Sequence, residues 1–532
     1  MTIEKHVKVF RAFVALIALF LLSCHHQSDN KPIPMMGDLK MGAYRVGYRT
    51  LFEYDRTRPG IPYSDWEGKL YRDHDPALGR QFQIHVWYPA TGEGDPMRFE
   101  QYVHLMGRET NFGESEEQEK FAEERFIQQT NDLGGEGKFT TIELAELLEM
   151  QVFAEYGAHA ETGPFPVVII PSGCSAAYHS ITAEFLASHG FVVVGFSPKG
   201  RFSWGMEIST LGLETAVDDL EFVVQQISNL PYVNVQEISL AGNAISSSVC
   251  ALALAKNSQF KALISLEGGL PSSFEQRLLN QTQVYAPQNL QVPMLFIYAP
   301  HPSIDPSHTF HLVHSDRYYA HFPKMSEFAM LNYGMFDAVV PDIIGEHEGG
   351  TKSGFETANK LMLRFLNNVH GKLDEPLFTD DFAVKNNAQI DTTFILTSVP
   401  AAPNLAEMKV LFLERGMMAI DSIYQTLQSQ GSKSPFSTSF YRDYRSWLAW
   451  KRDPEFSNRL QLYEMAYGSF PESSEVNYYL AAYLERTGDT LKAIHHYERT
   501  LQLLVTDEDP ALGIKRKGQI RQYAQEALEI LR

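Results

Sequence analysis

The chain has 532 residues, of which 44% are hydrophobic and 21% charged, and this globular composition supplies enough apolar material for two or three domains. Its formal net charge of −20 argues against nucleic acid as a partner, because phosphate binding needs a basic surface. The chain has only 3 cysteines, too few for a disulfide framework. Cys174 and Cys250 are expected to be small buried residues, with a single bridge between them as the alternative.

The first residues have the features of a bacterial secretion signal. A basic stretch precedes an apolar run over residues 12–22 that is too short to span a membrane. The run ends in Leu-Leu-Ser-Cys, which resembles the lipobox of bacterial lipoproteins. This resemblance implies a signal peptide over residues 1–23, lipidation of Cys24, a polar tether over residues 24–44, and a membrane partner reached through Cys24. The predicted location is the bacterial cell envelope, on the periplasmic face or the cell surface; an ordinary signal peptide with a chance cysteine is the alternative.

Residues 45–372 are predicted to form an α/β domain. The segment 79–90 alternates apolar and polar residues, as a half-buried strand does. Two acidic helices are predicted over residues 114–129 and 141–157, in an insertion that occupies about residues 100–158. They are expected to line or cover the upper edge of the sheet.

From residue 165 onward, short apolar runs alternate with amphipathic helical patterns. Buried strands that alternate with helices predict a doubly wound, mostly parallel sheet covered on both faces. The predicted strands are 165–170, 191–196, 237–242, 261–269, 292–300 and 326–334. The predicted helices are 180–190, 213–230, 246–255 and 354–371.

The stretch Gly242-Asn243-Ala244-Ile245-Ser246 joins a predicted strand to an alanine-rich helix. It has the outline of the nucleophile elbow G-x-S-x-G, with alanine in place of the serine. The order and spacing of this stretch and of the segments 79–90, 163–173, 185–200 and 261–269 resemble the α/β-hydrolase family. The resemblance is greatest to its platelet-activating-factor-acetylhydrolase and dienelactone-hydrolase-like esterases, and it extends over about residues 45–371.

The resemblance implies a role for each position of a catalytic triad. Ala244 stands at the nucleophile position, which needs a serine. Tyr333 stands at the histidine position, and a phenol with an ordinary pKa near 10 is a poor base at neutral pH. Glu267 retains the acid position, with Asp305 after the following strand as the alternative acid. Two of the three triad residues are therefore missing.

The resemblance also implies that the backbone N–H groups of Cys174 and Ile245 form the oxyanion hole. A relocated nucleophile at Ser246, with His347 as its base, is the alternative to a lost nucleophile; capping of the following helix is the ordinary role of such a serine. No cofactor and no metal are predicted, because the four histidines of residues 301–314 do not follow a metal-ligand spacing.

Two functions from different classes are consistent with these residues. The first is a catalytically inactive or strongly impaired lipoprotein of α/β-hydrolase fold that acts by binding a ligand or a protein. The second is a carboxylic-ester hydrolase that uses Ser246 as its nucleophile.

The C-terminal part is predicted to be separate. Periodicity fades over residues 373–403, which are expected to be a linker, and residues 404–532 are expected to be all-helical. The spacing of small residues and glycine over residues 480–497 resembles a tetratricopeptide repeat, with a generic helical bundle as the alternative. Repeats of this kind form concave surfaces, so a protein or peptide partner is predicted here. Candidate anchors, or else core residues, are Tyr483, Tyr497 and Trp447.

Overall fold

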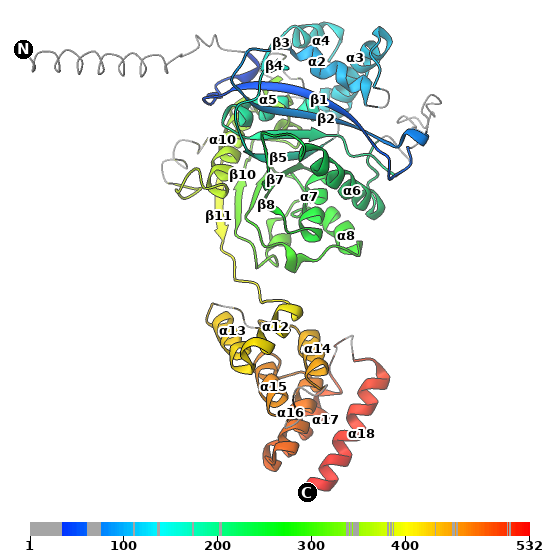
Figure 1. Cartoon of the computed structure of the whole chain (residues 1–532), viewed down its shortest axis with the longest axis vertical. Helices are drawn as coiled ribbons and strands as arrows, with labels where there is room; N and C mark the ends of the chain where they lie inside the picture. The colour runs from blue at the N-terminus through cyan, green and yellow to red at the C-terminus, as the bar shows by residue number, and fades with distance from the viewer. Residues whose placement is uncertain are drawn as a thin grey trace, which may run out of the picture. The chain divides into compact units, whose positions relative to one another are not determined.

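A computed structural model describes most of the chain from Pro34 to Arg532 (Figure 1). The described residues are 34–60, 76–109, 112–135, 139–172, 175–201, 205–336, 340, 343, 351–379, 382, 386, 388–430, 432, 434–449, 453, 456–507, 509 and 512–532. The chain divides into two compact units, the first comprising Met1–His311 and Arg317–Leu396, the second Leu312–Asp316 and Thr397–Arg532. The predicted signal peptide and Cys24 lie outside the described residues.

The first unit is built on a sheet to which eleven strands of the described chain contribute, in the order β11-β10-β9-β8-β7-β5-β6-β2-β1-β4-β3. Strands β5 to β10 run parallel to one another, β2 is antiparallel to β6, and β1 is antiparallel to β2. In this mostly parallel arrangement β6 lies between β2 and β5. The arrangement is that of the α/β-hydrolase fold and confirms the predicted fold class. The strands are β1 (Arg45–Asp55), β2 (Arg80–Ala90), β3 (Asp95–Arg98), β4 (Gln151–Tyr156), β5 (Phe165–Pro171), β6 (Val192–Phe196), β7 (Val233–Asn243), β8 (Phe260–Leu266), β9 (Met294–Tyr298), β10 (Arg317–His321) and β11 (Thr392–Leu396).

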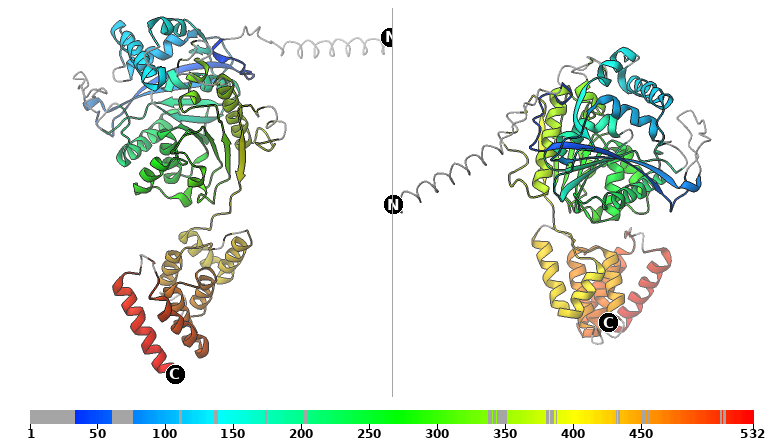
Figure 2. Two further views of the ribbon diagram at one scale, coloured as in Figure 1. Left: turned by 180° about the vertical axis from the view of Figure 1, so that it is seen from behind. Right: turned by 45° about the horizontal axis from the view of Figure 1, so that its top comes forward.

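Helices cover both faces of this sheet (Figure 1 and Figure 2). Helices α5 and α10 pack against each other on one face, and α6, α7 and α8 pack together on the other. The central strands β6 and β9 are buried almost along their whole length, as expected where helices lie on both sides. The helices are α5 (Ser175–Ser188), α6 (Thr210–Ile227), α7 (Ile245–Lys256), α8 (Ser273–Gln281), α9 (Tyr333–Phe336) and α10 (Thr351–Val369), and the short 3-10 helices of this unit include η1 (Pro34–Met36), η2 (Pro76–Leu78), η5 (Pro287–Asn289), η6 (Pro306–Thr309) and η7 (Phe328–Met330).

The insertion between β3 and β4 contains α2 (Phe99–His104), η3 (Leu105–Arg108), α3 (Glu116–Thr130), the π-helix η4 (Asn131–Gly135) and α4 (Thr141–Leu148). The predicted helix over 141–157 is wrong in its second half. That half is strand β4, which alternates in burial and pairs with β1 and β3. Alternation over six residues favours a strand where neighbouring strands can pair with it.

Two further expectations differ from the structure. The predicted strand 326–334 is wrong, because these residues form η7 and the start of α9, and the last parallel strand is β10. The predicted linker 373–403 contains β11, which pairs antiparallel with β10 and so belongs to the sheet. Both differences lie at the edge of the sheet, where strands are only partly buried and their apolar pattern is weak.

The second unit is helical. Consecutive helices pack against one another from α14 to α18, while α13 packs on α12 and α15. Gly488, with a φ of +89°, ends α16 before the turn into α17. Ala481 and Ala493 are fully buried, and Tyr483 and Tyr497 are core residues. The helices are α12 (Leu405–Arg415), α13 (Met417–Ser429), α14 (Thr438–Leu448), α15 (Ser457–Ser469), α16 (Ser474–Thr487), α17 (Thr490–Leu503) and α18 (Ile514–Leu531). Among the described residues of the whole chain, no helix combines the length and hydropathy needed to cross a membrane.

Candidate functional site

The turn between β7 and α7 has the backbone of a nucleophile elbow. Ala244 follows the last residue of β7 and precedes the first residue of α7, with φ 47° and ψ −127°. This is a strained conformation for a residue with a Cβ. A Cβ on Gly242 would lie 2.4 Å from the backbone nitrogen of Ser247, so the turn needs glycine there. The sequence therefore folds into the sharp strand-to-helix turn that presents a side chain at the carboxyl edge of the sheet.

Backbone contacts hold Ala244 in place. Its N–H donates to the carbonyl of Leu266 at 2.9 Å, and its carbonyl accepts from the N–H of Ser247 at 2.9 Å. A Cβ on Gly268 would lie 3.0 Å from the Cα of Ala244, so the loop after β8 passes directly beside the elbow. Ala244 is partly exposed, and it presents only a methyl group.

Glu267, at the predicted acid position, lies at the end of β8 in this same loop. It is 3% exposed and has a φ of 45°. Its Oε2 accepts a hydrogen bond from the N–H of Ala299 at 2.6 Å, and its own N–H donates to the carbonyl of Ile297. Burial raises the pKa of Glu267 to about 8, and the nearby carboxyls of Glu327 and Glu275 add to the rise. At neutral pH this side chain is therefore mostly a protonated acid.

Glu275 and Glu327 make this end of the sheet unusually rich in carboxyl groups. Glu275 lies in the first turn of α8 and accepts a hydrogen bond from the N–H of Gly269 at 2.6 Å. Burial raises its pKa to about 7. Burial also raises the pKa of Glu327, which His301 partly offsets. Burial therefore favours the protonated form of both carboxyl groups beside the elbow.

Ser246 lies in the first turn of α7. Its Oγ accepts from the N–H of Asn243 at 2.8 Å and donates to the carbonyl of the same residue at 2.8 Å. Ser246 is 5% exposed. The hydroxyl thus ties the turn to the helix, in the manner of a capping side chain.

Tyr333, at the predicted histidine position, is fully buried at the start of α9. Its hydroxyl lies 3.0 Å from Oγ1 of Thr130, at the end of α3. Its ring stacks on Tyr178 with centroids 5.3 Å apart, and the Tyr178 ring in turn stacks on Phe126 of α3. The tyrosine therefore takes part in packing the helical insertion against α5 and α9.

The other predicted site positions have less to contribute. Cys174 and His347 lie outside the described residues, and Ile245 is the first residue of α7. Asp305, the alternative acid, is exposed and caps η6 by accepting from the N–H of Ser307. Two histidines of the loop after β9 form hydrogen bonds with different partners. His308 bonds to the carbonyl of Pro271, and His301 bonds to Ser303.

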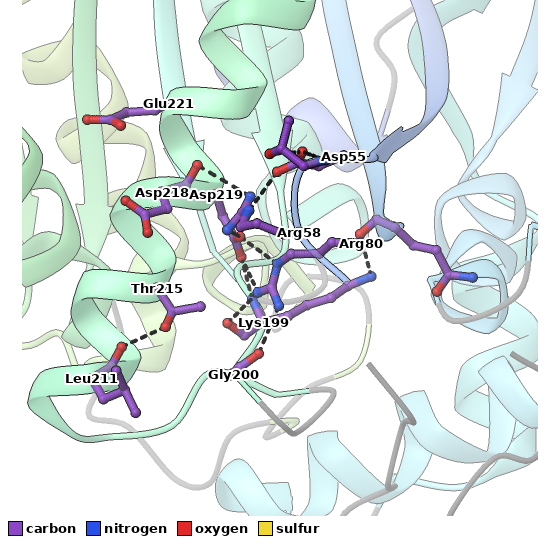
Figure 3. Close-up of polar contacts among 12 residues, drawn as sticks. Asp55, Arg58, Arg80, Lys199, Gly200, Leu211, Thr215, Asp218, Asp219 and Glu221 are labelled. Carbon is purple, nitrogen blue, oxygen red and sulfur yellow. Dashed lines mark hydrogen bonds and ion pairs between the residues drawn. The ribbon is translucent and has the colours of Figure 1, made fainter. Parts of the chain in front are cut away.

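A buried ion cluster at the end of β6 was not predicted from the sequence (Figure 3). Asp219 of α6 is fully buried and accepts two hydrogen bonds from Arg80, at 2.6 and 2.7 Å, and one from Arg58 at 2.7 Å. The Arg80 guanidinium also donates to the carbonyls of Lys199 and Gly200, in the loop after β6. This cluster fixes the loop that leaves the carboxyl end of β6.

Lys199 extends the same arrangement to the insertion. Its Nζ donates to the carbonyls of Gln81 and Glu109, and burial lowers its pKa to about 8. The carboxylate of Glu109 accepts from Ser197 Oγ at 2.5 Å. A GRQF stretch and a PKG stretch contain Arg80 and Lys199, but only their burial beside Asp219 gives them a positioning role.

Comparison with known proteins adds the following. No family model matches the sequence, and no curated protein matches it. Among solved structures, the chain is similar to a ferulic acid esterase from Streptomyces cinnamoneus, with 16% identity and a TM-score of 0.42, over 65% of this chain and 97% of the esterase. It is also similar to the acylaminoacyl peptidase of Pyrococcus horikoshii, with 14% identity and a TM-score of 0.32, over 42% of this chain and 40% of the peptidase. The strand order and the elbow, and not these identities or TM-scores, define the fold.

Proposed function

We propose that the first unit is an α/β-hydrolase-fold domain without serine-hydrolase activity, or with strongly impaired activity, and that it acts by binding a ligand or a protein. The observation that carries this proposal is the alanine at the strained tip of the elbow. A methyl group has no lone pair with which to attack a carbonyl carbon. The turn, in contrast, is held by backbone contacts that need no serine.

The neighbouring groups support the same conclusion. A triad acid must be ionised to stabilise an imidazolium, and burial keeps Glu267 mostly protonated at neutral pH. Tyr333 is buried against α3 and α5 and is a poor base. The hydroxyl of Ser246 is bonded in both directions to the backbone of Asn243, so the alternative ester hydrolase has no free nucleophile at that position.

The test is hydrolysis of p-nitrophenyl acyl esters by the purified chain, together with labelling by a fluorophosphonate probe. We expect no mapped adduct and turnover far below the value of roughly 1 per second that an ordinary esterase reaches. A Ser246→Ala variant should behave like the wild type. An adduct on Ser246, or turnover in the esterase range that Ser246→Ala abolishes, would favour the relocated-nucleophile hydrolase.

We propose further that the chain is a lipoprotein of the bacterial cell envelope, anchored through Cys24. The basic stretch, the short apolar run and the position of the cysteine support this proposal. Cys24→Ala should yield an unprocessed or soluble form, because stable attachment requires the acyl chains. Processing and tight membrane fractionation of the variant would contradict the assignment.

For the second unit we propose contact with a protein or peptide partner through a repeat-like helical surface. The packing of consecutive helices and the glycine turn between α16 and α17 support this. Tyr483 and Tyr497 are at most 4% exposed and serve the core, so they do not anchor the partner. Trp447 is partly buried and packs on Phe412. Crosslinking of the full chain in its native membrane, with and without residues 404–532, tests whether this unit recruits a partner.

A further inference from the structure

A cavity of about 200 Å³ lies between β1 and the helical insertion. It is distinct from the elbow: in the sheet order, β5, β6 and β2 separate β1 from β7. Its walls come from β1, β3 and β4 on the sheet side and from α2, η3 and the start of α3 on the other, elements that lie together in Figure 1. Nothing in the elbow chemistry uses this space.

The inner wall of the cavity is apolar and aromatic. Tyr48, Thr50 and Phe52 alternate along β1 and therefore present one face to the insertion. Tyr48 is 1% exposed, and the buried side chains of Met97 and Leu105 complete the wall. Such a wall suits the flat face of a ring.

The rim of the cavity is polar and contains both donors and acceptors. Gln101 and Ser115 are exposed, Gln118 and Glu119 are partly exposed, and Tyr156 stands at the mouth with 52% exposure. Amide, hydroxyl and carboxylate groups around an apolar wall can fix the orientation of a ligand that carries several polar groups.

Arg108 is held in a fixed position at this wall. Its guanidinium lies 4.3 Å from the centroid of the Phe52 ring, one terminal nitrogen pairs with Glu114, and the other donates to the carbonyl of Phe112 at 3.0 Å. Its Nε is closed to solvent and has no hydrogen-bond partner among the described residues, so this atom is not offered to a ligand.

Charged groups of both signs line the cavity. Arg108 is balanced by Glu114, and Glu119 adds a second carboxylate that repels an anion. A neutral ligand with hydroxyl groups avoids this repulsion and can still bond to the carboxylate, because a hydroxyl both donates and accepts. In size, a dry cavity of about 150 Å³ accepts benzene, so this one has room for a single substituted ring.

We propose that this cavity binds a neutral six-membered ring that carries several hydroxyl groups, that is, a hexose or the terminal hexose of a glycan. The ring lies against the β1 wall, and the carboxylate of Glu119 accepts from a hydroxyl. The site is independent of the proposed loss of hydrolase chemistry, since it shares no residue with the elbow.

The test is binding of D-glucose, D-galactose and D-mannose to the full chain, measured by saturation-transfer NMR and titration calorimetry. At least one should bind with a dissociation constant on the order of 1 mM, as expected for one ring with a few hydrogen bonds. Glu119→Ala should weaken binding at least fivefold. Glu117→Ala is the matched control, because it removes the same charge from the same first turn of α3 without lining the cavity.

Two further variants test the wall. Phe52→Leu removes the ring and should weaken binding, whereas Phe52→Tyr keeps it and should not. The proposal is overturned if none of the three hexoses binds, if binding is indifferent to Glu119→Ala and Phe52→Leu, or if benzoate or trimethylammonium binds in place of the hexoses.

Discussion

The carboxyl edge of the sheet contains two neighbouring structures that are held in different ways. At the end of β7, backbone hydrogen bonds to Leu266 and Ser247 hold the elbow, and Gly242 leaves room for the close approach of the Ser247 backbone. At the end of β6, the loop is held by side chains, through the buried contacts of Arg80 with Asp219 and with two carbonyls. We therefore expect replacement of the elbow side chain to cost the fold little, and loss of a member of the ion cluster to cost it more.

The largest effect is expected from Asp219→Ala. The change leaves the guanidinium of Arg80, whose side chain is 3% exposed, without its counter-ion, and it should destabilise the first unit by about 3 to 5 kcal/mol. The measurement is urea-dependent hydrogen exchange of the β5–β8 amides in the full chain. Asp218→Ala is the control, since its carboxylate is 53% exposed and pairs with Lys256, and it should cost no more than about 1 kcal/mol. Equal losses in the two variants would contradict the structural role of the cluster.

The next largest effect is a pH-dependent gain of stability in Glu267→Gln. The pKa of Glu267 is raised by burial to about 8 in the folded chain, above its unfolded value of 4.5. The folded state therefore keeps a proton that the unfolded state releases, and the stability that this proton contributes is lost as pH rises from 4.5 through 8. Glutamine does not titrate, so the variant should match the wild type at pH 5 and exceed its stability at pH 9 by on the order of 2 kcal/mol.

Denaturation in urea at pH 5, 7 and 9 measures this difference. Glu93→Gln is the matched control, because Glu93 is exposed in the turn after β2 and its replacement should not change the pH dependence. A gain for Glu267→Gln that is the same at all three pH values would show that burial does not raise this pKa.

A smaller effect is expected at the tip of the elbow. Ala244 has φ 47° and ψ −127°, a conformation that glycine adopts without the strain caused by a Cβ. Ala244→Gly should therefore stabilise the first unit by about 1 kcal/mol. Ala251→Gly, in the buried middle of α7, should do the opposite, since it loses helix propensity and packing. Thermal unfolding of the two variants decides the matter, and a loss of stability in both would mean that the elbow is not strained.

The sequence predicted those elements best whose side chains are buried on both faces or follow a clear helical period. Strands β5 and β6 and helix α6 lie close to their predicted ranges. Strands β1, β3, β4, β10 and β11 were missed. They form the two outer parts of the sheet, where half-exposed residues such as Tyr318 and Thr393 blur the pattern. Pairing at a sheet edge depends on which neighbouring strand has an unpaired side, and the sequence of the edge segment alone does not show this.

In the candidate site, too, the feature built from contiguous residues could be predicted, and the contacts between distant residues could not. The elbow could be located because its glycine, strand and helix are contiguous, and the structure puts the sharp turn at Ala244. The pairing of Arg80 with Asp219 joins residues 139 positions apart, and no local pattern indicates it. The raised pKa of Glu267 also arises only in the folded chain, from burial and from the carboxyls of Glu275 and Glu327 that fold beside it.

The smallest effect is expected from Ala244→Ser, which restores the missing hydroxyl and nothing else. The new oxygen would sit on the elbow tip at the N-terminus of α7, where a nucleophile belongs. A serine hydroxyl attacks only when a base removes its proton, and the residue at the base position is a buried phenol bonded to Thr130. The carboxyl at the acid position holds its own proton at neutral pH. We therefore expect p-nitrophenyl acetate turnover by the variant to remain indistinguishable from the wild type, and fluorophosphonate labelling to stay absent. Ala244→Gly serves as the control, since it changes the same position without adding a hydroxyl. Turnover by the serine variant near 1 per second would show that a competent base already faces the elbow, and the proposed lack of hydrolase activity would then follow from the absence of one hydroxyl group.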